Sequence, residues 1–230
     1  MASPWSAPAW MKLNKSLING GKLDPTIYNT YANYFVKYIN AFASYGITIN
    51  SITIQNEPLY AAPYLSLEMS AQEQINFIKN AIGPAFAKNN IKTKILIYDH
   101  NWDRPDYPIT VLADSAARQY ISGTAFHCYG GSVGAMSQVS TQYPDKGIYL
   151  ILIPYDDYFW GEESNMSIWK FEQSKKIDKT NYIKYPFMKW LRDNYNPDDY
   201  YMDKGFHLNE DGHKLFAEEY LPTFLNLNQY

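Results

Sequence analysis

The sequence of 230 residues contains one cysteine, which excludes an intramolecular disulfide and any zinc site built from several cysteines. It has little net charge, −3, and no run of like charge, which argues against a protein that coats nucleic acid. Its longest strongly apolar run, at 148–153, is far shorter than the roughly 18 residues of a membrane helix. No basic and then apolar secretory leader precedes Pro4, and the localisation stays unknown.

Aromatic residues are abundant, at 17% of the chain, with 22 tyrosines and 6 tryptophans. Rings with a polar tip suit sugar-binding clefts, and they suit ordinary cores equally. The hydrophobic content of 46% allows a sizeable core, and the length fits one large domain or two small ones.

Segments typical of strands alternate with segments typical of helices. β-Branched and apolar runs predict strands at 47–49, 51–54, 93–98, 124–129 and 147–153. Helical spacing after Asp24-Pro25, a capping box formed by Ser70 and Glu73, and the stretch 110–120 predict three helices. This alternation indicates parallel strands joined by right-handed crossovers, with polar clusters at the carboxyl ends of the strands, where α/β proteins place their sites.

One such cluster, Asn56-Glu57-Pro58, follows the strand at 51–54. A carboxylic acid held beside an amide is what a general acid needs to protonate a leaving group, provided that burial raises its pKa. A Glu-Pro turn on the surface is the alternative interpretation.

Five motifs occur in order between residues 3 and 149. They read SPWSAPAWMK at 3–12, IQNEP at 54–58, ILIYDHNW at 95–102, GTAFHCYGG at 123–131 and GIY at 147–149. Together they resemble glycoside hydrolase family 30, which contains glucosylceramidases and β-1,6-glucanases.

The resemblance implies a (βα)₈ barrel and a retaining mechanism that uses two glutamates. Glu57 matches the acid/base, and Asn56 would then donate a hydrogen bond to the sugar 2-hydroxyl. Four further residues match positions that line the family's sugar cleft, and for each of them packing in the core or at the rim is the alternative: Trp5, Trp102, His127 and Tyr129.

The sequence departs from this family at Leu152, which stands where the resemblance places the nucleophilic glutamate. Without that glutamate a retaining glycosidase cannot form its glycosyl-enzyme intermediate. Asp156 or Asp157 could replace it only at roughly 5–5.5 Å from Glu57, or farther away for an inverting route. The resemblance also begins at what looks like the third barrel strand, so it covers a barrel fragment.

The last part of the chain carries a second resemblance. Asp203 and His207, with the apolar strand at 147–153, resemble the C-terminal part of an SGNH (GDSL-like) hydrolase, in which Asp203 would orient His207 as the base. The Gly-Asp-Ser block of that superfamily's nucleophile is missing from the sequence. A metal site at His207, Asp211 and His213 is less favoured than a solvated helix N-terminus, so we expect no metal and no cofactor.

We therefore interpret residues 1–230 as a single α/β domain, with a glycosidase-like segment at 1–149 and an SGNH-like segment at 150–230. The leading hypothesis is an artificial or recombined chimera without catalytic turnover, which leaves residual sugar binding open. One alternative is a weak β-glycoside hydrolase that uses Glu57 as acid/base. The other is an esterase that uses Asp203 and His207.

The expected fold class is α/β with parallel strands and helical crossovers, as an open, doubly wound, flavodoxin-like sheet built from a partial barrel. Five or six strands are too few for the usual eight-stranded closure. An incomplete barrel, or a barrel completed in a dimer, is the alternative. A carbohydrate is the expected ligand, with no nucleic-acid or membrane partner, and the chain would be a monomer or a homodimer.

Overall fold

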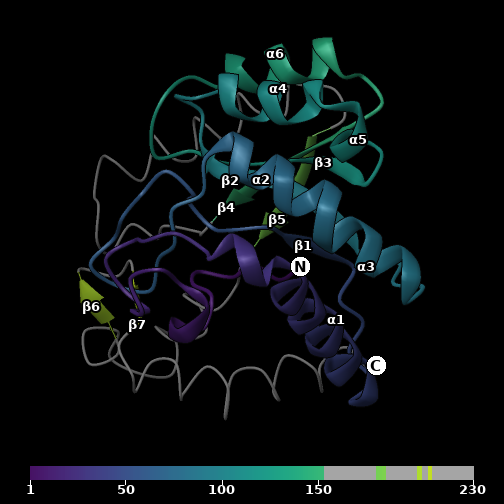
Figure 1. Ribbon diagram of the computed structural model, residues 1–230. Helices are drawn as coiled ribbons and strands as arrows, with labels where there is room; N and C mark the ends of the chain where they lie inside the picture. The colour runs from purple at the N-terminus through teal and green to yellow at the C-terminus, as the bar shows by residue number, and fades with distance from the viewer. Residues whose placement is uncertain (153–179, 185–200, 204–206, 209–230) are drawn as a thin grey trace, which may run out of the picture. The chain divides into compact units, whose positions relative to one another are not determined.

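The computed structural model describes residues 1–152, 180–184, 201–203 and 207–208 (Figure 1). The chain divides into two compact units, Met1–Ile151 with Gln173–Tyr182, and Leu152–Glu172 with Ile183–Tyr230. The first boundary falls inside the seam predicted near residues 150–155. However, residues 173–182 belong to the first unit, so the units are not two consecutive segments.

Helices and strands alternate along the first unit, as predicted. The helical elements are η1 (Ala9–Met11), η2 (Pro25–Ile27), α1 (Tyr28–Ser44), α2 (Ala71–Phe77), the π-helical turn η3 (Ile78–Ile82), α3 (Gly83–Lys88), α4 (Asp106–Ala113), α5 (Ser115–Arg118) and α6 (Gly134–Gln142). The strands are β1 (Ser51–Thr53), β2 (Lys94–Asn101), β3 (Ile121–His127), β4 (Gly147–Leu152) and β5 (Thr180–Lys184). Two short strands, β6 (Tyr201–Asp203) and β7 (His207–Leu208), form a separate antiparallel pair.

The main sheet has the order β1-β2-β3-β4-β5, and the pairs β1–β2, β2–β3 and β3–β4 are parallel. The predicted parallel α/β class and the open sheet are confirmed. The prediction of a doubly wound sheet is wrong. A doubly wound sheet reverses its strand order at a switch point, whereas this order contains no reversal. Right-handed crossovers between strands in chain order place successive helices on one face, as in a barrel wall. Figure 1 accordingly shows α1, then α2 with α3, then α4 with α6, in a row beside the strands.

Local signals set the predicted helix starts. The Asp24 side chain accepts a hydrogen bond from the Thr26 amide before α1, and Ser70 and Glu73 form the predicted capping box before α2. The helix predicted at 110–120 is split in two, because Asp114 ends α4 with an extended backbone and caps α5 by accepting from the Ala117 amide. Helix α6 was not predicted.

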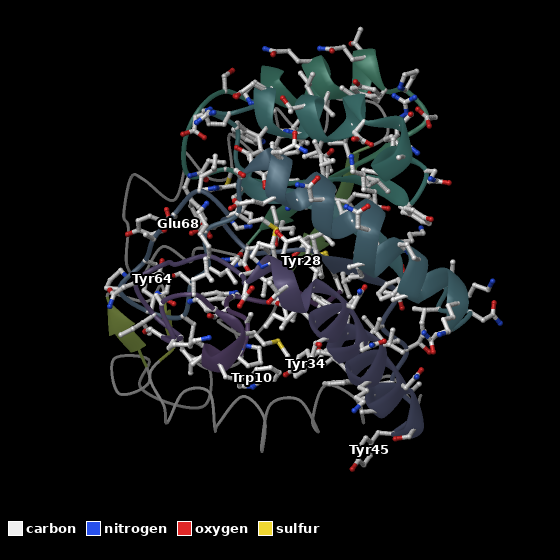
Figure 2. The ribbon with its side chains drawn as sticks, viewed as in Figure 1. Trp10, Tyr28, Tyr34, Tyr45, Tyr64 and Glu68 are labelled. Carbon is white, nitrogen blue, oxygen red and sulfur yellow. The ribbon has the colours of Figure 1, made fainter. Side chains whose placement is uncertain are left out.

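An aromatic cluster joins α1 to α2. The Tyr31 ring lies 4.9 Å from the Phe35 ring and 5.5 Å from the Phe77 ring, measured between centroids. Tyr28, at the first turn of α1 (Figure 2), meets Phe77 edge-on at 5.3 Å. Tyr28 and Tyr31 therefore pack helices together, which was the alternative to a sugar cleft. Within the described ranges, no helix is both long and apolar enough to cross a membrane.

Candidate active site

Three polar side chains meet at the carboxyl ends of β1, β2 and β3. Glu57 follows β1, Asp99 lies near the end of β2, and His127 is the last residue of β3. The segments are tied together by the backbone, since the Glu57 amide donates to the Asp99 carbonyl at 2.9 Å and the Asn56 amide donates to the Pro4 carbonyl at 2.9 Å. Side chains far apart in the sequence are thus held at one edge of the sheet.

His127 lies between two carboxylates. Its Nδ1 is 3.0 Å from Glu57 Oε1, and its Nε2 is 3.0 Å from Asp99 Oδ1. The Glu57 side chain is 18% exposed, whereas those of His127 and Asp99 are 8% and 0% exposed. Glu57 is therefore the member of the group that a ligand can reach.

Asp99 is saturated with hydrogen bonds. Its Oδ2 accepts from the Ser3 hydroxyl at 2.5 Å and from the Thr53 hydroxyl at 2.7 Å, while its Oδ1 faces His127. A fully buried carboxylate with these partners has no free oxygen to offer a sugar. It cannot serve as the second carboxylate of a glycosidase.

The backbone is held in an uncommon conformation around this group. Tyr98 and Asp99 have φ of 71° and 59°, and Glu57 has φ of 46°, all in the left-handed region that non-glycine residues rarely adopt. The register between β2 and β3 also shifts between Tyr98 and His100. This β-bulge re-aims side chains at the end of β2, as bulges beside active sites do.

The three groups shift one another's pKa. Burial acts to lower the pKa of His127, but hydrogen bonds and charges from Asp99 and Glu57 outweigh it and raise that pKa to about 9. Burial acts to raise the pKa of Glu57 and of Asp99, yet the hydrogen bond and charge of His127 bring both below their ordinary values. The condition for a general acid, a pKa raised by burial, is therefore not met by Glu57 in this arrangement.

His100 and Trp102 follow on the same strand end and are largely buried. Burial lowers the pKa of His100, so its ring is neutral near pH 7. Among the described residues, His100 Nδ1 and Trp102 Nε1 have no hydrogen-bond partner. Trp102 is only 2% exposed, which matches the packing alternative for this residue rather than an open cleft wall.

The other predicted cleft residues lie closer to solvent. The Tyr129 ring stands edge-on to His127 at 5.6 Å and the residue is 39% exposed. The Trp5 ring lies 5.7 Å from that of Tyr64, on the loop after β1 (Figure 2), and the Trp5 carbonyl accepts from Gln55 Nε2. The structure thus brings Glu57 and Tyr129 to the same imidazole ring, that of His127.

Asp203 and His207 are paired residues of β6 and β7 in the second unit. Their side chains lie outside the described residues, as do Asp156, Asp157 and the helix predicted after Asn209. The roles predicted for Asp203 and His207 stay predictions.

Sequence reasoning missed three contributors to the site, Asp99, Ser3 and Thr53. Asp99 opens the polar cluster that closes the strand at 93–98, and that position was the available signal. Ser3 and Thr53 carried no such signal, because their role is only to donate hydrogen bonds to Asp99.

Parallel strands in chain order, with polar side chains gathered at their carboxyl ends, are the arrangement of a fragment of a βα barrel. Residues 1–190 match the glycosyl hydrolase family 30 TIM-barrel domain. The chain belongs to this family.

Relatives and solved structures agree with this assignment. The chain is 44% identical to an endo-1,6-β-D-glucanase of Neurospora crassa over 58% of its own length and 28% of the relative's. It is 29% identical to the lysosomal acid glucosylceramidase of Mus musculus over 73% and 35% of the two lengths. The solved structure of the endo-β1,6-glucanase BT3312 is 32% identical with a TM-score of 0.71, over 79% of this chain and 44% of that one. The chain thus spans about a third of these curated relatives' length.

The family match runs across residues 149 and 150, where a junction between two hydrolase fragments was predicted, and continues to residue 190. The recognised glycosidase family is confirmed. The comparisons give no support to an SGNH-like part or to a chimera.

Proposed function

We propose that this chain carries a carbohydrate site that recognises β-linked glucosyl units, with Glu57 at the acid/base position and no turnover through a glycosyl-enzyme intermediate. The observation that carries the proposal is the Glu57–His127–Asp99 group at the carboxyl ends of β1 to β3, in a chain of glycoside hydrolase family 30.

The substrate class is supported by the relatives and by the site's chemistry. Relatives named as endo-1,6-β-D-glucanases are 41–44% identical to this chain. A part-exposed carboxylate next to an exposed aromatic ring suits a sugar, because the carboxylate accepts from hydroxyl groups and the ring packs on the apolar face of the pyranose. Glu57 and Tyr129 provide these two elements.

The proposed absence of turnover rests on which carboxylates are available to act together with Glu57. The resemblance places Leu152 at the nucleophile position, and β4 ends at this residue. Among the residues whose side chains are described, Asp99 is the carboxylate joined to Glu57 through His127, and it is fully buried and saturated. A retaining mechanism requires a second, accessible carboxylate roughly 5–5.5 Å from the acid/base.

The proposal is tested by titrating the full chain with a β-1,6-linked gluco-oligosaccharide, followed by calorimetry or NMR. Tyr129→Ala should weaken binding about tenfold, the loss expected for removing one aromatic contact of about 1.4 kcal/mol. Asp145→Asn, at a side chain that is 69% exposed, is the matched control and should bind like the parent chain. Failure of the parent chain to bind would refute the proposed recognition.

Turnover is tested separately with an activated aryl β-glucoside. We expect release at the buffer rate. Release above buffer that disappears in Glu57→Gln would instead establish the alternative, a weak β-glycoside hydrolase that uses Glu57.

A further inference from the structure

Asp99 is the group in this site that cannot touch a ligand. It is fully buried, its carboxylate meets Ser3, Thr53 and His127, and its carbonyl accepts the Glu57 amide.

We propose that Asp99 is a positioning residue for Glu57 and acts through His127: it fixes the imidazole ring and keeps both of its nitrogens protonated, so that Glu57 always faces an N–H. This inference rests on the proposed role of Glu57 and deepens it.

The first argument is the number of protons on the ring. A neutral imidazole has one N–H and one lone pair, whereas His127 has a carboxylate oxygen 3.0 Å from each nitrogen. A neutral ring would therefore direct a lone pair at an anion in a buried site. Double protonation removes this repulsion, because each carboxylate then accepts a hydrogen bond from one ring nitrogen.

The second argument is the rigidity of Asp99. Its backbone adopts φ of 59° at the β-bulge, and the Ser3 and Thr53 hydroxyls hold the carboxylate from a second side. Glu57 has fewer constraints and is part-exposed. Asp99 is thus the fixed end of the chain of hydrogen bonds, and Glu57 is the end that can respond to a ligand.

The other charged or titratable groups near Asp99 and His127 do not keep the His127 ring protonated. His100, on β2, interacts electrostatically with Glu57, but it is neutral near pH 7 because burial lowers its pKa. The Tyr129 ring contacts His127 edge-on and carries no charge. Within the part of the chain that the structure describes, Asp99 and Glu57 are the two groups that hydrogen-bond His127 and favour its charged form.

The experiment follows His127 by NMR in the full chain with labelled histidines, the signal being assigned by its loss in His127→Gln. In the parent chain at pH 7 both ring nitrogens should show the shifts of protonated nitrogens. In Asp99→Asn the pKa of His127 should fall by about 1 to 2, the effect of removing a neighbouring opposite charge. Asn has the same shape as Asp and tolerates a positive φ, so this variant is expected to fold.

Thr53→Val is the matched control, because it removes one hydrogen bond to Asp99 but leaves the negative charge in place. It should lower the pKa of His127 much less than Asp99→Asn does. An unchanged pKa in Asp99→Asn, or a neutral His127 in the parent chain at pH 7, would overturn the inference. Failure of the parent chain to bind the sugar would refute the proposed function, but it would leave the inference about Asp99 and His127 intact.

Discussion

Replacing His127 by glutamine should change how the free energy of unfolding depends on pH. The ordinary histidine pKa of 6.5 is raised to about 9 in the folded chain, since Asp99 and Glu57 outweigh the effect of burial. A difference of about 2.5 between the folded and unfolded pKa corresponds to about 3 kcal/mol of stability, at about 1.4 kcal/mol for each pKa unit. His127→Gln removes this contribution because glutamine does not titrate.

The sign follows from the direction of the shift. The folded pKa of His127 is above the unfolded one, so the folded state binds the proton more tightly. The stabilisation is fully present below about pH 6.5 and is lost as the pH rises through about 9. Between pH 6 and pH 9.5 the free energy of unfolding of the parent chain should therefore fall by about 3 kcal/mol more than that of His127→Gln.

Urea unfolding at the two pH values measures this difference. Tyrosine and lysine titrations are common to both proteins and cancel when the variant is subtracted from the parent. His100→Gln is the matched control, since the pKa of His100 is lowered by burial and its removal should leave the alkaline loss in place. Equal losses in the parent chain and in His127→Gln would refute the ion-pair reasoning.

Three further substitutions test the packing that supports the site, each by urea or thermal unfolding. Lys12→Ala should cost about 2–4 kcal/mol, because the buried ammonium donates to the Ser66 carbonyl at 2.6 Å, and its removal leaves a cavity and takes away the shorter of that carbonyl's hydrogen bonds; near-parent stability would contradict this. Gly123→Ala should cost about 1–3 kcal/mol, since the new Cβ would stand 2.3 Å from the Gly147 carbonyl oxygen of β4, and an unaffected Tm would show that the strands can separate freely. Ser70→Ala should cost about 1 kcal/mol by breaking the capping box of α2, and no loss would mean that the cap is redundant.

The sequence predicted those parts of the fold that depend on neighbouring residues. Asp24 and Ser70 bind amides two or three residues away, so their helix starts could be read from the sequence. The split at Asp114 rests on the same kind of local cap, since its side chain accepts from the Ala117 amide three residues on, and the prediction of one helix at 110–120 overlooked it. The winding of the sheet was likewise mispredicted, since strand order is a property of long-range pairing.

The site was predictable only in part for the same reason. Glu57, His127 and Tyr129 came from motif resemblance, and the structure places them together. Asp99 was missed, because its importance comes from a β-bulge and from partners in two other segments, Ser3 and Thr53. No spacing rule within one strand encodes that convergence.

If Leu152 stands at the nucleophile position, as the proposed function holds, this residue also bears on the pKa of Glu57. A general acid must arrive protonated, but His127 holds the pKa of Glu57 below its ordinary value. In a retaining pair the second carboxylate opposes such an effect, because a like charge roughly 5–5.5 Å away raises the pKa of the acid. Leucine carries no charge, so under the proposed function residue 152 would neither form the covalent intermediate nor raise the pKa of Glu57.

Leu152→Glu should therefore change two measurements together. We expect the pKa of Glu57, followed by carboxyl NMR against Glu57→Gln, to rise toward or above its ordinary value, and aryl β-glucoside release to exceed that of the parent chain. Leu152→Gln has nearly the same shape without the charge, so it should do neither. If Leu152→Glu left both the pKa of Glu57 and the release rate unchanged, residue 152 would not be in reach of Glu57, and the nucleophile position would have to be sought elsewhere in the chain.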